Sequence, residues 1–169
     1  SVITKERIVK AYNNIRKNSE MCENYSLKKE LVIPRLQWVI PELETIDSYW
    51  FERIPYLEKF YNSDYEGDNI LARTLIQRII NEPEEFDNEK TYQAIDDCLE
   101  KTWTSSLVNK THWSAYFLNL QKIIEECWKA GTLVGPGRGS GVGFILLDML
   151  GITQINPLRE TTETFSFRF

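Results

Sequence analysis

The residues of this chain best suited to bind a ligand lie in one glycine-rich stretch, LVGPGRGSGVG, from Leu133 to Gly143. Glycine lets the backbone adopt positive φ and approach a ligand closely. A short β-prone segment precedes the glycines and an apolar helical pattern follows them. That order would present backbone N–H groups and a helix N-terminus to an anion. The stretch therefore suits a phosphate group.

Three side chains in the stretch strengthen this hypothesis. Arg138 carries a planar fork of donors that can bind two phosphate oxygens. Ser140 can cap the following helix or donate its hydroxyl, and Pro136 stiffens the approach. The helix dipole adds only about 0.3–1 kcal/mol, so Arg138 and the N–H groups must supply most of the binding energy. The alternative is a tight turn that packs the following helix against a neighbour and leaves Arg138 in solvent.

Two common phosphate motifs do not fit the stretch. A Walker A loop requires GxxxxGK[ST], and no Lys follows Lys129. The dinucleotide pattern GxGxxG fails because Ser140 or Val142 occupies the third glycine position. The loop is of a different kind.

The elements before this loop are predicted to be helical, because apolar residues recur three and four positions apart. Between the first and second helices, residues 42–61 are rich in aromatic side chains, and we expect an extended first half and a helical second half. The predicted helices run from Thr4 to about Met21, from Asp68 as N-cap to a stop before Pro83, from Asp87 as cap through Trp103, and from Trp113 to Trp128 with Gly131 as C-cap.

The segment that contains the loop is predicted to add the only strand. Thr132 to Val134 is short and β-prone, and Ser140 to Leu150 is apolar on nearly every side, which is typical of a buried helix. The sequence therefore predicts a mostly α fold in which a strand, a Gly-rich loop and a buried helix follow a helical region.

Composition limits the possible partners and surroundings. With 20 basic and 25 acidic side chains and a net charge of -5, any contact with nucleic acid must be local. Cys22, Cys98 and Cys127 are odd in number and widely spaced, which favours reduced thiols in a cytoplasmic protein. No stretch of about 18 apolar residues and no signal peptide is present, so we expect a soluble protein that does not enter a membrane. The termini, Ser1 and Phe169, suggest an excised fragment.

The motif VGPGRGS and the GITQINPL segment at Gly151 to Leu158 together resemble the C-family replicative DNA polymerases, meaning the bacterial DNA polymerase III alpha subunit and its phage relatives. In that family a GPGRGS loop, a ten-residue apolar helix and a GIT-x-x-x-PL segment follow one another at the same spacing. Tyr116-Phe117-Leu118 before the loop and Arg168-Phe169 after it match as well. The resemblance is strong over about the last 55 residues and weaker over the rest, including residues 8–34.

This resemblance implies a function and a domain plan. Gly137, Arg138, Gly139 and Ser140 would hold the triphosphate of an incoming dNTP, at the start of a nucleotidyltransferase-type palm at residues 111–169. Residues 1–110 would form a helical connecting or thumb-like region. In the family, Mg²⁺ is held by an Asp-x-Asp pair that falls after this chain ends, and the sequence contains no such pair. We therefore expect no catalytic residue, no metal and no polymerase activity in this fragment alone, and we expect primer-template DNA and possible replisome subunits as partners of the full-length enzyme.

Several positions depart from the family pattern. Gln154 and Asn156 stand where the family usually has aspartates, and Gly141 stands in place of an alanine. These differences suggest a divergent member, such as a phage or prophage enzyme. Asp148 replaces an apolar or aromatic residue, and a carboxylate near a helix C-terminus is unfavourable for the dipole, so we expect it to be exposed or paired with Arg or Lys.

Other candidate sites are weaker. His112, the only histidine, is predicted to be a cap or packing residue because no nucleophile pattern accompanies it. The acidic residues around Gly67 lack the final Glu of a calcium loop. The aromatic residues are predicted to pack in the core rather than stack nucleobases, because few basic residues interleave with them: Trp38, Tyr49, Trp50, Phe51, Tyr56, Phe60 and Tyr61.

Two other functions remain open at this point. One is a non-enzymatic helical protein-interaction module in which the glycines form a packing turn and the acidic surface binds a partner. The other is a nucleotidyltransferase that acts on a small molecule or a protein. Arg138 separates the first from a polymerase, because a packing turn has no use for an exposed arginine between two glycines.

Overall fold

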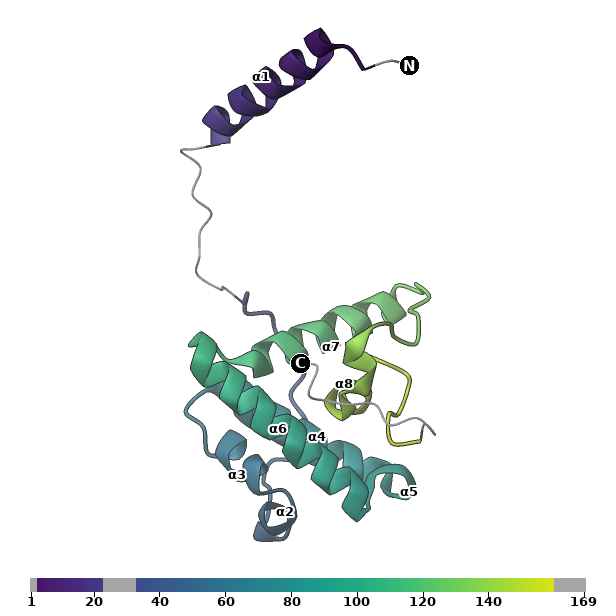
Figure 1. Cartoon of the computed structure of the whole chain (residues 1–169). Helices are drawn as coiled ribbons and strands as arrows, with labels where there is room; N and C mark the ends of the chain where they lie inside the picture. The colour runs from purple at the N-terminus through teal and green to yellow at the C-terminus, as the bar shows by residue number, and fades with distance from the viewer. Residues whose placement is uncertain (1–2, 23–32, 160–169) are drawn as a thin grey trace. The chain divides into compact units, whose positions relative to one another are not determined.

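Helices make up all the regular structure in the described residues of the computed structural model, which are 3–22 and 33–159. The mostly α prediction is therefore confirmed. The helices are α1 Lys5–Cys22, α2 Ser48–Arg53, α3 Pro55–Tyr61, α4 Glu66–Asn81, α5 Pro83–Phe86, α6 Glu89–Asn109, α7 Trp113–Lys129, the 3-10 helix η1 Ser140–Gly143, and α8 Ile145–Met149 (Figure 1).

The chain divides into two compact units, Ser1–Leu31 and Val32–Phe169. The first unit contains α1, which agrees with the helix predicted from Thr4 to Met21. All residues of α1 are exposed. The second unit contains α2 to α8. The predicted boundary between residues 1–110 and 111–169 stays a prediction. No helix in the described parts of the chain is long and apolar enough to cross a membrane.

The core of the second unit lies between α4, α6 and α8. Leu71, Leu75 and Ile79 of α4 are buried, as their helical spacing predicted. Ile95 and Leu99 of α6 face them in the same cluster. Burial of one such side chain contributes about 1.5–3 kcal/mol, which is what fixes the position of each helix. From α8 the cluster adds Ile145, Leu146, Leu147 and Met149.

The second half of the region 42–61 is helical, as predicted, and the helical part already begins at Ser48. Residues 42–46 form no regular structure. Asp47 caps α2 by accepting a hydrogen bond from Tyr49 N at 2.9 Å, and Pro55 is the first residue of α3. The aromatic residues of this part of the chain pack on the core as predicted, with Phe60 and Trp38 buried and only Tyr49 largely exposed.

Both predicted aspartate caps are wrong, although the helices exist. Helix α4 begins two residues before Asp68, which lies in its first turn with a buried side chain that contacts other side chains. Helix α6 is capped by Asn88, whose Oδ1 accepts from Thr91 N at 3.0 Å. Asp87 instead accepts a hydrogen bond from the Tyr92 hydroxyl. At Asp68 the contacts with distant residues determined the side chain's role, and at Asp87 a local hydrogen bond from a residue five positions later did.

The segment around the glycine loop differs most from the prediction. Thr132–Val134 is not a strand, and the described residues contain no strand with which it could pair. Leu133 is 92% exposed, so no packing replaces that pairing. The helix predicted from Ser140 to Leu150 is split into η1 and α8 by the extended Phe144, and only the second part is fully buried.

Candidate functional site

The glycine loop begins where α7 ends in a glycine-capped turn. Gly131 has a φ of 72°, and its N–H donates to Trp128 O at 2.9 Å. Thr132 N donates to Cys127 O at 3.0 Å. This pair of bonds satisfies the last carbonyls of the helix and turns the chain away from its axis. The predicted C-cap role of Gly131 is confirmed.

One side of the loop packs against the polypeptide that follows α8. Gly137 has a φ of 126°, and a Cβ at this position would lie 2.7 Å from Val142 Cγ1 and 3.0 Å from Thr153 Cγ2. Only glycine fits both that φ and that space. Beside it, Gln154 N donates to Pro136 O at 2.8 Å. The loop therefore has a packed rear side.

The other side of the loop is open to solvent. Gly137, Arg138, Gly139 and Ser140 are all exposed and consecutive. Among the described residues, none accepts a hydrogen bond from the N–H groups of residues 137–139, and none forms an ion pair or hydrogen bond with the Arg138 side chain. The four predicted site residues thus form one exposed stretch whose N–H groups and guanidinium are not bonded to any part of the chain that the structure describes.

The helix-dipole part of the phosphate hypothesis is wrong. Ser140 begins the four-residue η1, Gly139 occupies the N-cap position with a φ of 90°, and no side chain caps the turn. A helix dipole grows with the number of aligned peptide groups. A turn of this length therefore contributes little to anion binding. Attraction for an anion must come from Arg138 and the unpaired N–H groups.

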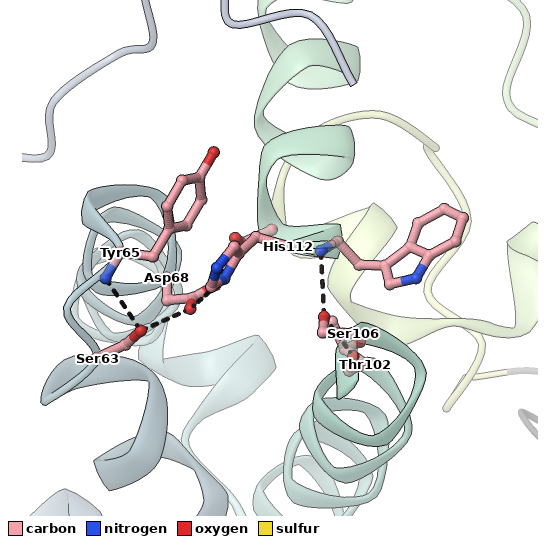
Figure 2. A network of polar contacts seen from close by, with 8 residues as sticks. Ser63, Tyr65, Asp68, Thr102, Ser106 and His112 are labelled. Atoms are coloured by element: carbon pink, nitrogen blue, oxygen red, sulfur yellow. Dashed lines mark hydrogen bonds and ion pairs between the residues drawn. The ribbon is translucent and has the colours of Figure 1, made fainter. Parts of the chain in front are cut away.

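A second polar cluster lies between α4 and α7, centred on the buried Asp68 (Figure 2). Its carboxylate accepts hydrogen bonds from Ser63 Oγ at 2.7 Å and from the Ser114 hydroxyl. His112 Nδ1 lies 3.1 Å from Asp68 Oδ2, and the His112 ring stacks on Tyr65 with 3.9 Å between centroids. This Asp68 network satisfies its own groups, so it joins helices rather than binding a ligand.

His112 has the packing role that was predicted. It occupies the N-cap position of α7 without a side-chain capping bond. The role of Asp68 was missed, because its first-turn position suggests a cap and because two of its three partners lie 44 and 46 residues away in the sequence. A lone buried carboxylate leaves no periodic signal.

A cavity of about 500 Å³ lies behind the loop, beside α8. Asp148 lines it, only 9% exposed, and burial raises the pKa of this carboxyl to about 6. Glu85 raises that pKa further, while Arg78 and Arg159 oppose the rise. Arg159 pairs with Glu85 at 3.0 Å, and no ion pair within the described residues includes Asp148. The expectation that Asp148 is exposed or paired is therefore wrong.

The described residues contain no group of three or more His, Cys, Asp or Glu side chains that could hold a metal ion. The cysteines are free, with Cys22 exposed, Cys127 half-buried and Cys98 buried. Burial raises the pKa of the Cys98 thiol to about 12. The Asp68 network likewise offers one buried carboxylate and one imidazole, which are too few for a metal centre.

Comparison with known proteins adds a family to this geometry. The family model described as the bacterial DNA polymerase III alpha NTPase domain matches residues 70–169, which is more than half of the chain and includes the glycine loop. The chain belongs to this family.

Individual relatives carry polymerase names. The chain is 29% identical over 167 residues to "Probable DNA polymerase YorL" of Bacillus subtilis and to the "DNA-directed DNA polymerase" of Bacillus phage SPbeta, an overlap of 93% of this chain and 13% of each relative. It is 32% identical over 89 residues to DNA polymerase III subunit alpha of Mycoplasma genitalium, which covers 53% of this chain and 10% of that protein. No solved structure matches the chain.

These overlaps bear on the predicted resemblance. The overlap with the first two relatives confirms that it extends over nearly the whole chain, and phage relatives were expected. The chain spans only about an eighth of the length of those two relatives.

Proposed function

We propose that this chain is the part of a DNA-directed DNA polymerase that holds the triphosphate of the incoming dNTP during DNA replication. In this proposal the loop is the start of the palm. Gly137, Gly139 and Ser140 offer backbone N–H groups to the phosphate oxygens, and Arg138 binds two of those oxygens through its guanidinium. Primer-template DNA and other replisome subunits would contact the longer protein.

The observation that carries the proposal is the exposed Arg138, which has no partner among the described residues and lies between two glycines with positive φ. Gly137 and Gly139 have φ values of 126° and 90°, conformations that few other residues adopt. The result is an exposed cation beside unpaired N–H donors. An exposed arginine between two positive-φ glycines contributes nothing to the packing of α8, so the open side of the loop favours binding over the protein-interaction alternative.

The chemistry of transfer requires groups outside the described residues. Phosphoryl transfer in a polymerase uses Mg²⁺ ions held by carboxylates, which stabilise the attacking and leaving oxygens. The sequence has no Asp-x-Asp pair, so this chain would bind and orient the triphosphate while carboxylates elsewhere in a longer polymerase hold the metal. We expect the chain alone to bind dNTP weakly and not to extend a primer.

A titration of dATP into the 169-residue chain at low salt tests the proposal. Arg138→Ala is expected to weaken binding at least about 10-fold, and Arg138→Lys to recover only part of it, because a lysine lacks the planar fork. Arg7→Ala is the matched control, since Arg7 is exposed in α1 and its loss changes the net charge equally. Equal affinity of wild type and Arg138→Ala would contradict the proposal.

A further inference from the structure

We propose that the side chain of Thr153 and the backbone N–H of Gln154 position the glycine loop, which they hold from its rear side so that its exposed N–H groups face solvent before any ligand arrives. We call Gly151–Gln154 the holding turn. This inference rests on the proposed function, because it assigns a task to the holding turn in phosphate binding. It adds two residues to a site that otherwise consists of the loop alone.

The first contact is a hydrogen bond between the two segments. Gln154 N donates to Pro136 O at 2.8 Å. Within residues 133–139, this is the one backbone group that forms a backbone hydrogen bond with the described residues. The bond fixes the carbonyl immediately before Gly137, so it also fixes the direction in which the next peptide begins.

The second contact is steric. The position of a Cβ on Gly137 is blocked by Thr153, whose Cγ2 and Cβ would lie 3.0 and 3.3 Å from it. Thr153 is 7% exposed, and its hydroxyl oxygen has no hydrogen-bond partner among the described residues. Thr153 therefore acts through its methyl group, which together with Val142 fills the space beside the Gly137 Cα.

The holding turn is itself fixed to the core. The N–H groups of Ile152 and Thr153 both donate to Leu147 O, at 2.8 and 3.1 Å. Gly151, with a φ of 68°, donates to Asp148 O at 2.8 Å. Leu147 lies in the buried helix α8, which packs on α4 and α6. Contacts thus run continuously from the core to the rear side of the loop.

Such an arrangement has a definite effect on affinity. Ordering one residue costs about 1–2 kcal/mol of conformational entropy. A loop held before binding has already lost that freedom, so less of the phosphate interaction is spent on ordering it. Loss of the Thr153 methyl should therefore weaken nucleotide binding without touching any group that contacts the nucleotide.

Three variants of the 169-residue chain test this. Thr153→Ala removes Cγ2, Thr153→Val keeps both branches and removes only the unpartnered hydroxyl, and Gln154→Ala keeps the backbone N–H. Thr102→Ala is the matched control, because Thr102 is similarly buried but lies in α6 and bonds to Cys98 O. The first readout is the rate of trypsin cleavage after Arg138, which rises when the loop detaches. The second is the dissociation constant for dATP.

We expect Thr153→Ala to speed cleavage after Arg138 and to weaken dATP binding, each at least about 5-fold. The variants Thr153→Val, Gln154→Ala and Thr102→Ala should stay within about 2-fold of wild type in both readouts. Wild-type cleavage in Thr153→Ala would overturn the inference. Equal damage in Thr153→Val would overturn it too, since the hydroxyl rather than the methyl would then matter.

The two readouts separate this inference from the proposed function. If wild type does not bind dATP, or if Arg138→Ala binds as wild type does, the proposed function is wrong. The role of Thr153 in nucleotide binding would then be wrong as well. The rates of trypsin cleavage would still decide whether the holding turn fixes the loop. If wild type binds dATP and Thr153→Ala opens the loop but binds equally well, the positioning role alone is overturned.

Discussion

The Asp68 network and the glycine loop are both polar, yet they differ in hydrogen bonding. The groups of the network bond to one another, whereas the exposed donors of the loop have no partner among the described residues. The buried carboxylate of Asp68 accepts from two serine hydroxyls and lies beside the His112 imidazole. The loop exposes three N–H groups and the Arg138 guanidinium, for which the described residues provide no partner. A cluster that satisfies itself holds a fold together, whereas one that leaves donors free towards solvent is suited to a ligand.

The largest effect is expected from Asp68→Ala. Two serine hydroxyls would lose their acceptor and the His112 ring its neighbour, around an empty buried space, so the free energy of unfolding should fall by about 3 kcal/mol, as measured by urea unfolding. Asp64→Ala is the control, because Asp64 is exposed four residues earlier and should change stability by less than about 0.5 kcal/mol. A loss at Asp68 no greater than at Asp64 would show that the Asp68 network does not stabilise the fold.

The next effect is expected from Gly137→Ala. The new Cβ would meet Val142 and Thr153 and would have to accept a φ of 126°, so stability should fall by about 2 kcal/mol. Gly135→Ala provides the control, since its Cβ would meet nothing within 4 Å. Thermal unfolding of both variants checks this. Equal stability of the two would show that the rear side of the loop is not packed.

A smaller and pH-dependent effect is expected from Asp148→Asn. The folded protein holds this carboxyl with a raised pKa of about 6, so the folded state binds the proton more tightly than the unfolded chain does. Stability from this group is therefore full below the unfolded pKa near 4 and is lost as pH rises towards 6 and above. The full shift corresponds to about 3 kcal/mol, and screening at the cavity mouth should leave about 1 kcal/mol.

Asp148→Asn should accordingly stabilise the protein at pH 7.5 and bring little gain at pH 4.5, as followed by urea unfolding at both pH values. An equal gain at the two pH values would mean that Asp148 does not titrate in this range. The result would measure what the hydrogen-bond donors contribute at Asp68, because Asp148 is buried like Asp68 but has no such donors among the described residues.

The smallest effect on stability is expected from Arg138→Ala. No described residue pairs with this side chain, so the free energy of unfolding should change by less than about 0.5 kcal/mol. Differential scanning calorimetry would measure it, with the dATP titration on the same samples. A stability loss above about 1 kcal/mol would place Arg138 with the structural residues instead.

The sequence predicted the long helices well and their ends poorly. Apolar spacing identified α4, α6 and α7, because burial of one helical face leaves a periodic pattern. Asp68 was misplaced as a cap because its side chain bonds to residues distant in the sequence, and Asp87 because it bonds to the Tyr92 hydroxyl while Asn88 caps the helix. The strand at Thr132–Val134 was predicted from β-propensity alone. That propensity takes effect only where a neighbouring strand is present to pack and pair with, and the described residues provide none.

The candidate site was predictable in its residues but not in its construction. The glycine spacing indicated where positive φ would be needed, and Gly137 and Gly139 have it. Neither the contact of Thr153 with Gly137 nor the hydrogen bond from Gln154 to Pro136 could be inferred, because both join segments more than fifteen residues apart. Motif spacing indicates which residues occur together and is silent on which of them support the others.

The glycine-capped end of α7 determines where this chain tolerates added length. Between Gly131 and Gly135 the chain has left the helix and has not reached the holding turn, and Leu133 projects into solvent. Extra residues there would lengthen an unsupported connection at a modest entropic cost. One residue inserted between Pro136 and Gly137 would move Gly137 out of register with Thr153 and Val142. Loop length can therefore vary before Gly135 and is fixed after it.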